Sequence, residues 1–367
     1  MGFPIWMCGS LAQAPHAHFL ISAARLLPTV GLQISKAYAR EKKELFGLNM
    51  SGSEFSYGTY PSNDDLDYVR SKGIIIIRLP ISWELMQPIL YDSFNKTYLV
   101  GLQKTLSAAA VRGMSVIVDL HNYGRYNGGI GITTDDTRAG NGQGKTVGSA
   151  SVPIDAFTDF WSKLADVLKN QPGIYAYDIM NEPHDMGDGQ RNDMTDSSIW
   201  TRAAQAAVNS IRKVDMDTTI MVEGTNYSSA ISWLRHNSNF VINDPANKLL
   251  YEAHQYFDGP RGGGKYKLSY DGQGAYPNIG VDLIQPWLRW LERNRFQGFL
   301  GEFGVPNDDP RWNTVLNNVL THLNANGVSG AVWAYRNQAQ WWPSPLFVNP
   351  VGGQDASQLA TLIAHMN

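Results

Sequence analysis

Residues 173–184 read Gly-Ile-Tyr-Ala-Tyr-Asp-Ile-Met-Asn-Glu-Pro-His. The mixture of β-branched and aromatic residues predicts a short buried strand that stops at Asn181-Glu182-Pro183, because proline cannot donate to a strand ladder. An acid placed where an apolar strand ends is partly desolvated, and burial raises a carboxyl pKa. Glu182 is therefore a candidate proton donor near neutral pH. Taken alone, the stretch is equally typical of a core strand followed by a surface-loop glutamate.

The rest of the chain repeats the same kind of strand in alternation with helical patterns. The strand candidates are residues 45–52, 74–81, 115–123, 174–181, 219–224, 249–256, 298–304 and 330–335. The helix candidates are residues 64–72, 99–112, 154–169, 198–214, 231–237, 283–293, 314–326 and 357–365. Strands that alternate with helices pair in parallel through crossovers, and eight such units favour a closed barrel. We therefore predict an α/β fold, a (β/α)8 TIM barrel that forms a single domain over residues 44–367.

An open doubly wound sheet is the structural alternative. That fold would need a glycine-rich phosphate turn after its first strand, and Asn49-Met-Ser-Gly-Ser does not supply one. The two longest irregular stretches, residues 124–151 and 259–280, both follow predicted strands. In a barrel they would lie on the face where active sites are built.

Composition excludes several classes of function. The chain has 367 residues, and its formal net charge of -3 gives no signature of nucleic-acid binding. Cys8 is the single cysteine, so neither an intramolecular disulfide nor a cysteine-based metal site can form. Aromatic residues make up 11% of the chain, which leaves rings available for flat ligands such as sugar faces. Beyond the amino terminus, no stretch is long and apolar enough to span a bilayer.

Residues 1–43 form a separate leader with two open interpretations. An apolar run over residues 19–34 is followed by Ala37-Tyr38-Ala39, which places small residues where a signal peptidase reads them. Against a signal segment, the positively charged start is missing and Arg25 interrupts the apolar run. The leader is therefore either a signal segment of a secreted or periplasmic protein or a disordered extension.

Polar residues stand at the carboxyl ends of six predicted strands, which a barrel delivers to a common rim. They are Arg78, the Asp119–Asn122 stretch with His121, Asn181 with Glu182, His254 with Tyr256, Glu302, and finally Trp333 with Tyr335. Two carboxylic acids with opposed environments are the working parts of glycoside hydrolysis, because one must be protonated and the other ionised.

The neighbours of the two acids support this division. Arg78 can keep Glu302 ionised, and Tyr256 can donate a hydrogen bond to the same carboxylate. Trp333 offers a flat face for a sugar ring, although it is also suited to cap the barrel core.

Histidines and acids at one rim also raise the question of a metal. The histidines are not arranged as His-Glu-x-x-His on a helix, and the Arg78 cation would oppose a divalent ion. We therefore predict catalysis without a metal or other cofactor.

In order along the chain, the motifs at these strand ends are Arg78-Leu-Pro, Asp119-Leu-His-Asn-Tyr, Met180-Asn-Glu-Pro-His, His254-Gln-Tyr, Gly301-Glu-Phe-Gly and Trp333-Ala-Tyr. From about Leu45 to the end, this set resembles glycoside hydrolase family 5, and most closely its subfamily of fungal and bacterial endo-β-1,4-glucanases. The leader before Leu45 has no counterpart in the family, and the loop over residues 259–280 and the tail over residues 338–354, with Trp341 and Trp342, are where substrate preference could differ.

The resemblance implies a retaining double displacement with Glu182 as acid/base and Glu302 as nucleophile. It further implies substrate contacts for the other rim residues: Asn181 with the sugar 2-hydroxyl, His121 and His254 with the central sugar, and Trp333 as its platform, while Arg78 and Tyr256 hold Glu302.

The expected partner is a β-glucan polysaccharide, bound by a monomer. An endo-β-mannanase, a mixed-linkage β-glucanase and a non-catalytic sugar-binding barrel are the alternatives.

Overall fold

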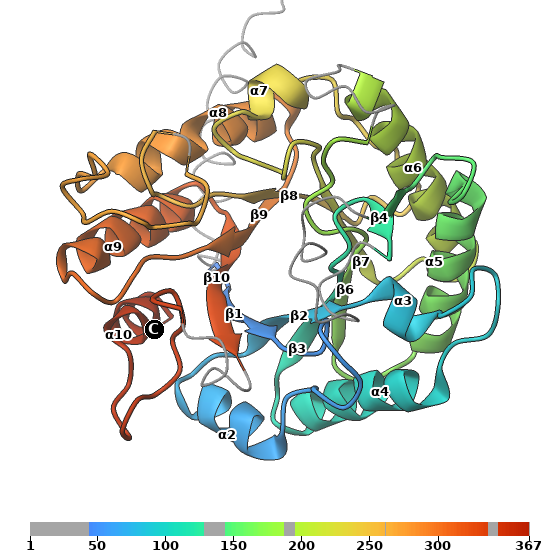
Figure 1. The fold of residues 1–367 in the computed structure, drawn as a ribbon, viewed down its shortest axis with the longest axis horizontal. Helices are drawn as coiled ribbons and strands as arrows, with labels where there is room; N and C mark the ends of the chain where they lie inside the picture. Colours follow the sequence, from blue (N-terminus) through green and yellow to red (C-terminus); the bar gives the residue numbers. More distant parts are fainter. Residues whose placement is uncertain (1–43, 128–143, 187–194, 261, 337–343, 367) are drawn as a thin grey trace, which may run out of the picture. The chain divides into compact units, whose positions relative to one another are not determined.

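The computed structural model describes residues 44–127, 144–186, 195–260, 262–336 and 344–366. The leader over residues 1–43 and the tail residues Trp341 and Trp342 lie outside this description. Within it, eight parallel strands close into a barrel in the order β1-β10-β9-β8-β7-β6-β3-β2 (Figure 1). The strands are β1 (Phe46–Ser51), β2 (Ile76–Ile81), β3 (Ser115–Leu120), β6 (Ile174–Asp178), β7 (Thr219–Glu223), β8 (Leu249–His254), β9 (Gly298–Phe303) and β10 (Ser329–Arg336). The predicted TIM barrel is confirmed, and the open-sheet alternative is wrong.

Helices surround the barrel at every crossover (Figure 1). They are α2 (Asn63–Ser71), α4 (Lys96–Val111), α5 (Ile154–Leu168), α6 (Thr195–Arg212), α7 (Trp233–His236), α8 (Ile279–Asn294), α9 (Arg311–Ala325) and α10 (Ser357–Ala364). Each matches a predicted helix, although α7 is limited to one turn. Ser62 caps the start of α2 with a capping box. Its side chain accepts from the Asp65 N–H, and the Asp65 side chain accepts from the Ser62 N–H.

Two small elements were not predicted. The one-turn helix α3 (Trp83–Met86) follows β2, and a two-stranded antiparallel hairpin joins β4 (Arg125–Tyr126) to β5 (Lys145–Thr146). Both are too short to show a periodic pattern of apolar residues, which is the signal on which the sequence analysis depended. Both follow barrel strands.

The barrel interior changes from apolar to polar along the strands. The layer nearer the amino ends of the strands is a separate apolar cluster with one residue from each of six strands: Ile76, Ile117, Ala176, Met221, Phe299 and Ala331. Because side chains alternate across a strand, the residue two positions later faces inward again. Those positions hold Arg78, Asp119, Asp178, Glu223, Gly301 and Trp333. The same alternation that builds the core therefore places charged groups directly above it.

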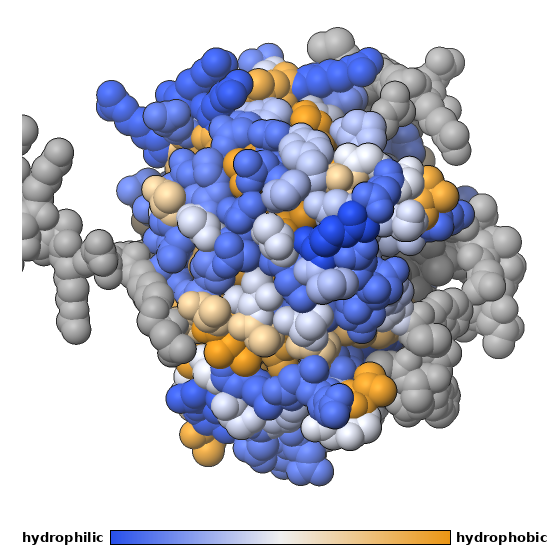
Figure 2. Space-filling model, turned by 90° about the vertical axis from the view of Figure 1, so that its left-hand side faces the viewer, coloured by the Kyte–Doolittle hydropathy of each residue, from blue (hydrophilic) through white to orange (hydrophobic). Residues whose placement is uncertain are grey.

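The outer helices bury one face against the barrel and present the other to solvent. In α5, seven residues of one stripe are buried: Ala156, Phe157, Phe160, Trp161, Leu164, Ala165 and Leu168. On the side of the molecule that carries α8, α9 and α10, the surface is mostly hydrophilic, with apolar residues in small groups (Figure 2). Of the helices in the described part of the chain, none combines the length and apolar character that a membrane span requires.

Candidate active site

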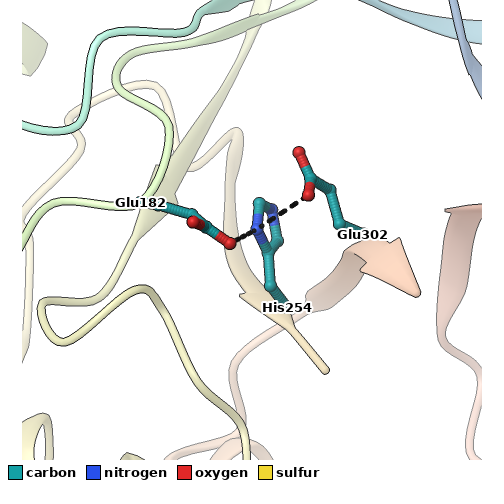
Figure 3. A group of neighbouring side chains, drawn as sticks. All are labelled: Glu182, His254 and Glu302. Atoms are coloured by element: carbon teal, nitrogen blue, oxygen red, sulfur yellow. Dashed lines mark hydrogen bonds and ion pairs between the residues drawn. The ribbon is translucent and has the colours of Figure 1, made fainter. Parts of the chain in front are cut away.

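The two predicted catalytic acids meet at the carboxyl end of the barrel, although β7 and β8 separate the strands that carry them. Glu302 lies within β9, and Glu182 follows β6 by four residues with a positive φ of 44°. Between them stands His254, the last residue of β8 (Figure 3). Its Nδ1 lies 2.9 Å from Glu182 Oε1 and 3.7 Å from Glu302 Oε2. One oxygen of each acid and one His254 nitrogen all lie within 4.8 Å of one another.

Glu302 is held by two donors. Arg78 Nη1 donates to its Oε1 at 2.9 Å, and the Tyr256 hydroxyl donates to its Oε2 at 3.0 Å. These are the two contacts that the sequence analysis expected. Burial raises the pKa of the Tyr256 phenol well above its ordinary value, and the charge of Glu302 raises it further. The hydroxyl therefore keeps its proton and stabilises negative charge on Glu302.

Glu182 has a contrasting environment. Burial raises the pKa of its carboxyl, and the charge of Glu302 raises it further, while the hydrogen bond with His254 opposes both. Its side chain is still 17% exposed, so the residue is not closed off from a ligand at the barrel mouth. A carboxyl that holds its proton beside one that bears charge is the pairing that acid-assisted bond cleavage needs.

Arg78 is the centre of a buried ionic layer. Its guanidinium contacts five carboxylates at 2.7–3.1 Å, namely Asp119, Asp178, Glu223, Glu252 and Glu302. Apart from Glu302 at 6%, these side chains have no exposed surface. Ionising all five around one cation without water is unfavourable, so protons remain on part of the layer. Accordingly, burial raises the pKa of Asp178 well above its ordinary value, with the charge of Glu252 adding to the effect.

His121 and Trp333 form one wall of the site. Their rings stack with centroids 5.7 Å apart and planes 15° apart. His121 Nδ1 lies 2.7 Å from Asp119 Oδ2, and the Tyr123 hydroxyl lies 3.1 Å from His121 Nε2. Burial alone would lower the pKa of His121, but Asp119 outweighs it and raises the pKa. Trp333 remains half-buried, which leaves part of its ring for a ligand.

Asn181 offers an unused donor. Its Oδ1 accepts from Arg78 Nη2 at 2.9 Å, which fixes the orientation of the amide. Its Nδ2 is buried and has no hydrogen-bond partner within the described ranges. A buried amide nitrogen without a partner, on the residue that precedes Glu182 in sequence, is a candidate donor to a hydroxyl of a ligand.

The position of Tyr335 corrects one expectation. From the sequence, Tyr335 was expected at the rim with Trp333, because residues two apart share a face of a regular strand. In the structure its hydroxyl donates to Asp65 Oδ1 at 2.6 Å, outside the barrel on α2. Leu48 pairs with Val332 and Met50 with Tyr335, so β10 has one extra residue there. This bulge reverses the alternation and turns Tyr335 outward.

Three buried acids of the layer were missed altogether: Asp178, Glu223 and Glu252. Each interrupts an otherwise apolar strand two residues after an inward-facing apolar residue, namely Ala176, Met221 and Leu250. A search for acids at period two inside predicted strands would have found them. Glu223 was missed because no rim residue was expected from the strand over residues 219–224, and Asp178 and Glu252 because they lie inside their predicted strands.

The site also meets a simple geometric test for a metal. The described residues include two groups of three possible ligands: Glu182, His254 and Glu302, and then Glu223, Glu252 and His254. Glu223 and Glu302 also pair with the Arg78 cation. The acids Glu182 and Glu223 have raised pKa values through burial. Although burial lowers the pKa of His254, Glu223 and Glu302 raise it well above the ordinary value, and a protonated imidazole cannot coordinate a metal. A divalent ion at either group would have to displace these protons and compete with the Arg78 cation.

A barrel with paired acids and an aromatic wall at its carboxyl end is typical of glycoside hydrolases. The family model described as Cellulase (glycosyl hydrolase family 5) matches residues 37–339, and the chain belongs to this family. It is 30% identical to endo-β-1,4-glucanase B of Aspergillus niger over 318 residues, 83% of this chain and 84% of that protein.

Solved structures are similar as well. Endoglucanase Cel5A of Pseudomonas stutzeri in complex with cellobiose is 38% identical, with a TM-score of 0.76 over 88% of this chain and 92% of that one. The endo-β-1,4-glucanase Xac0029 of Xanthomonas axonopodis pv. citri is 29% identical, with a TM-score of 0.75 over 88% of this chain and 98% of that one.

Proposed function

We propose that this glycoside hydrolase is an endo-β-1,4-glucanase that cleaves cellulose and related β-glucans with retention of configuration. The observation that carries the proposal is the spacing of Glu182 and Glu302, whose nearest oxygens lie within 4.8 Å. Retaining enzymes place their carboxyl groups about 5–5.5 Å apart, and inverting enzymes leave about 6.5–9.5 Å for a water molecule. The short spacing supports direct attack by a carboxylate.

In the first step, the Glu302 carboxylate attacks the anomeric carbon as the bond to the leaving oxygen breaks. Glu182 gives its proton to that oxygen. In the second step, water gives a proton to the Glu182 carboxylate and attacks the same carbon, which breaks the ester bond and releases Glu302. Arg78 and Tyr256 stabilise Glu302 whenever it carries charge.

The remaining site residues bind the sugar. Asn181 Nδ2 donates to the 2-hydroxyl, where hydrogen bonds strengthen as the oxocarbenium-like transition state forms. Trp333 provides the platform for the central sugar. His121 stacks on Trp333 and contacts the same sugar. His254 lies between the two acids, and its ring also faces the central sugar.

The glucan specificity rests on the relatives named endo-β-1,4-glucanases and on the cellobiose complex of the Pseudomonas stutzeri enzyme. The test compares reducing-sugar release from carboxymethylcellulose, lichenan, mannan and xylan, with Glu302→Ala as the inactive control. Preference for carboxymethylcellulose supports the proposal. Higher activity on mannan or lichenan would replace it with one of the alternatives, and no activity on any polymer would favour a sugar-binding barrel.

We further propose that residues 1–43 are a leader that directs export of the catalytic domain over residues 44–367. The apolar run over residues 19–34 and the Ala37-Tyr38-Ala39 stretch support this proposal. The test is N-terminal sequencing of protein recovered from the culture medium or periplasm. A terminus just after Ala39 is expected, whereas intact protein that stays in the cytoplasm would contradict export.

A further inference from the structure

Glu223 is a fully buried carboxylate at the end of β7 that contacts both the main chain and the histidine partner of Glu182. Its Oε2 accepts the Glu182 N–H at 2.8 Å. Its Oε1 lies 3.0 Å from Arg78 Nη2 and 3.2 Å from His254 Nε2. In addition, the Glu223 carbonyl oxygen accepts the Trp200 indole N–H at 2.7 Å, which anchors its own main chain.

The main-chain contact bears on an unusual backbone conformation. Glu182 has a φ of 44°, in the left-handed region that residues with a side chain rarely adopt. Such a conformation persists only where its surroundings fix it. On one side Asn181 N–H donates to Leu120 O at 2.9 Å, and on the other Tyr227 N–H donates to Pro183 O at 3.2 Å. The bond from Glu182 N–H to Glu223 fixes the residue between them, and with it the direction of the Glu182 side chain.

The contact with His254 bears on the Glu182 carboxyl itself. A carboxylate beside Nε2 favours a proton on that nitrogen, and with Nδ1 also protonated the imidazolium donates to Glu182 Oε1 at 2.9 Å. Oε1 is then occupied as an acceptor. The Glu182 proton is left on Oε2, the oxygen that is free to face a leaving group.

We propose that Glu223 is a positioning residue for the proton donor, Glu182. This proposal rests on the proposed function. One of its oxygens accepts from the main chain of Glu182, and the other forms an ion pair with His254, so that Glu182 presents a protonated oxygen to the departing sugar. It touches neither substrate nor reacting atom.

Charged and titratable groups surround Glu223 on several strands. They are Arg78 from β2, Asp119 from β3, Asp178 from β6, Glu182 after β6, Glu252 and His254 from β8, and Glu302 from β9. Burial raises the pKa of Glu223 to about 7, while His254 and Arg78 oppose the rise. Since the His254 hydrogen bond lowers the pKa of Glu182, losing the anionic partner of His254 should raise it.

The test uses Glu223→Gln, which keeps an acceptor for Glu182 N–H but removes the charge, with Glu252→Gln as the matched control. Glu252 contacts Arg78 at 3.1 Å and His254 Nε2 at 3.5 Å in the same layer. No contact between Glu252 and Glu182 is found among the described residues. Both variants therefore lose one buried acid from the same cluster, and thermal unfolding of each reports the structural cost.

Each variant is assayed on cellohexaose and on 2,4-dinitrophenyl cellobioside. Cleavage of cellohexaose needs acid assistance, because its leaving group is a sugar hydroxyl. The dinitrophenolate of the aryl substrate leaves without a proton. For Glu223→Gln we expect kcat/KM, which reports the step in which the leaving group departs, to fall about 10-fold or more on cellohexaose and at most about 3-fold on the aryl substrate. We also expect the alkaline limb of kcat/KM to move up by about half a pH unit or more. Glu252→Gln should change both substrates by the same factor.

Equal losses on both substrates, or an unmoved alkaline limb, would overturn the role of Glu223. If Glu223→Gln does not fold, Glu223→Asp replaces it, because aspartate keeps the charge but is too short to reach Glu182 N–H. The same selective loss on cellohexaose is then expected, and an equal loss on both substrates counts against the proposal. Failure of the wild-type enzyme to cleave cellohexaose would instead contradict the proposed function.

Discussion

Gly301 and Glu252 lie on neighbouring strands so closely that a Cβ atom on Gly301 would stand 1.5 Å from Glu252 Oε1. Gly301 precedes Glu302, and its carbonyl oxygen accepts from Asn49 Nδ2 at 2.8 Å. The glycine of the Gly-Glu-Phe-Gly motif is thus required by packing, because the buried acid occupies the space of its side chain. The position of Glu302 depends on this close approach.

Gly301→Ala should therefore destabilise the protein, by about 1–3 kcal/mol in the free energy of unfolding, because the added methyl group overpacks the ionic layer. Urea unfolding measures the change. Gly263→Ala is the control, since a Cβ there meets no atom within 4 Å. Equal stability of the two variants would show that the layer can relax around the methyl group.

Arg78→Lys should lower the free energy of unfolding by about 3–5 kcal/mol, because one ammonium group cannot partner five buried carboxylates. Denaturant unfolding at neutral pH measures this loss. Arg112→Lys is the comparison, because Arg112 pairs at 2.7 Å with Asp67, which is 63% exposed. Exposed pairs contribute little, so that variant should unfold like the wild type. A similarly small effect at Arg78 would mean that the layer does not depend on its cation.

Tyr256→Phe should reduce kcat on the order of 10–100-fold, because a hydrogen bond to a charged group is lost from the nucleophile. Steady-state kinetics on cellohexaose measure the loss. In the control Tyr276→Phe, the deleted hydroxyl donates to Asp282 on the surface, and activity should not change. An unchanged kcat for Tyr256→Phe would mean that Arg78 alone is sufficient to hold Glu302.

The pH profile should carry the signature of Glu182. Burial raises its pKa, and activity on substrates with poor leaving groups requires its protonated form. Activity should therefore persist above the ordinary carboxyl range and fall as the pH rises through the raised pKa. Glu182→Gln should abolish that alkaline limb on activated aryl substrates. Glu54→Gln is the control, because it also removes a buried acid whose pKa is raised by burial. The alkaline limb should remain in that variant. Survival of the limb in Glu182→Gln would assign the acid to another residue.

Azide should separate the two acids by stereochemistry. Glu302→Ala should be nearly inactive on every substrate, and azide that enters the empty nucleophile site should give a product of inverted configuration. Glu182→Ala should still form the glycosyl-enzyme from an aryl cellobioside, and azide should release it with retained configuration. NMR of the anomeric proton distinguishes the products. Exchanged configurations would reverse the two roles, and full activity in either variant would show that the site is elsewhere.

The sequence by itself determined the barrel and the residues at its rim. Apolar runs that alternate with helical patterns specify strands and crossovers, and parallel pairing then brings Glu182, His254 and Glu302 to one end. These are local patterns, and each can be read within about ten residues. For the same reason the short helix α3 and the β4–β5 hairpin were not predicted, since neither is long enough to form a pattern.

The tertiary structure decided how the rim residues relate to one another. The bulge that turns Tyr335 outward, the left-handed backbone of Glu182 and the acids gathered on Arg78 all depend on neighbouring strands. Arg78 and Glu223 are 145 residues apart in the chain, yet they form one buried contact. Burial and charge act through space, so the pKa of Glu182 is set by groups on other strands, such as His254 and Glu302. Strand periodicity shows which way a side chain points, but only the closed barrel determines which charges it meets.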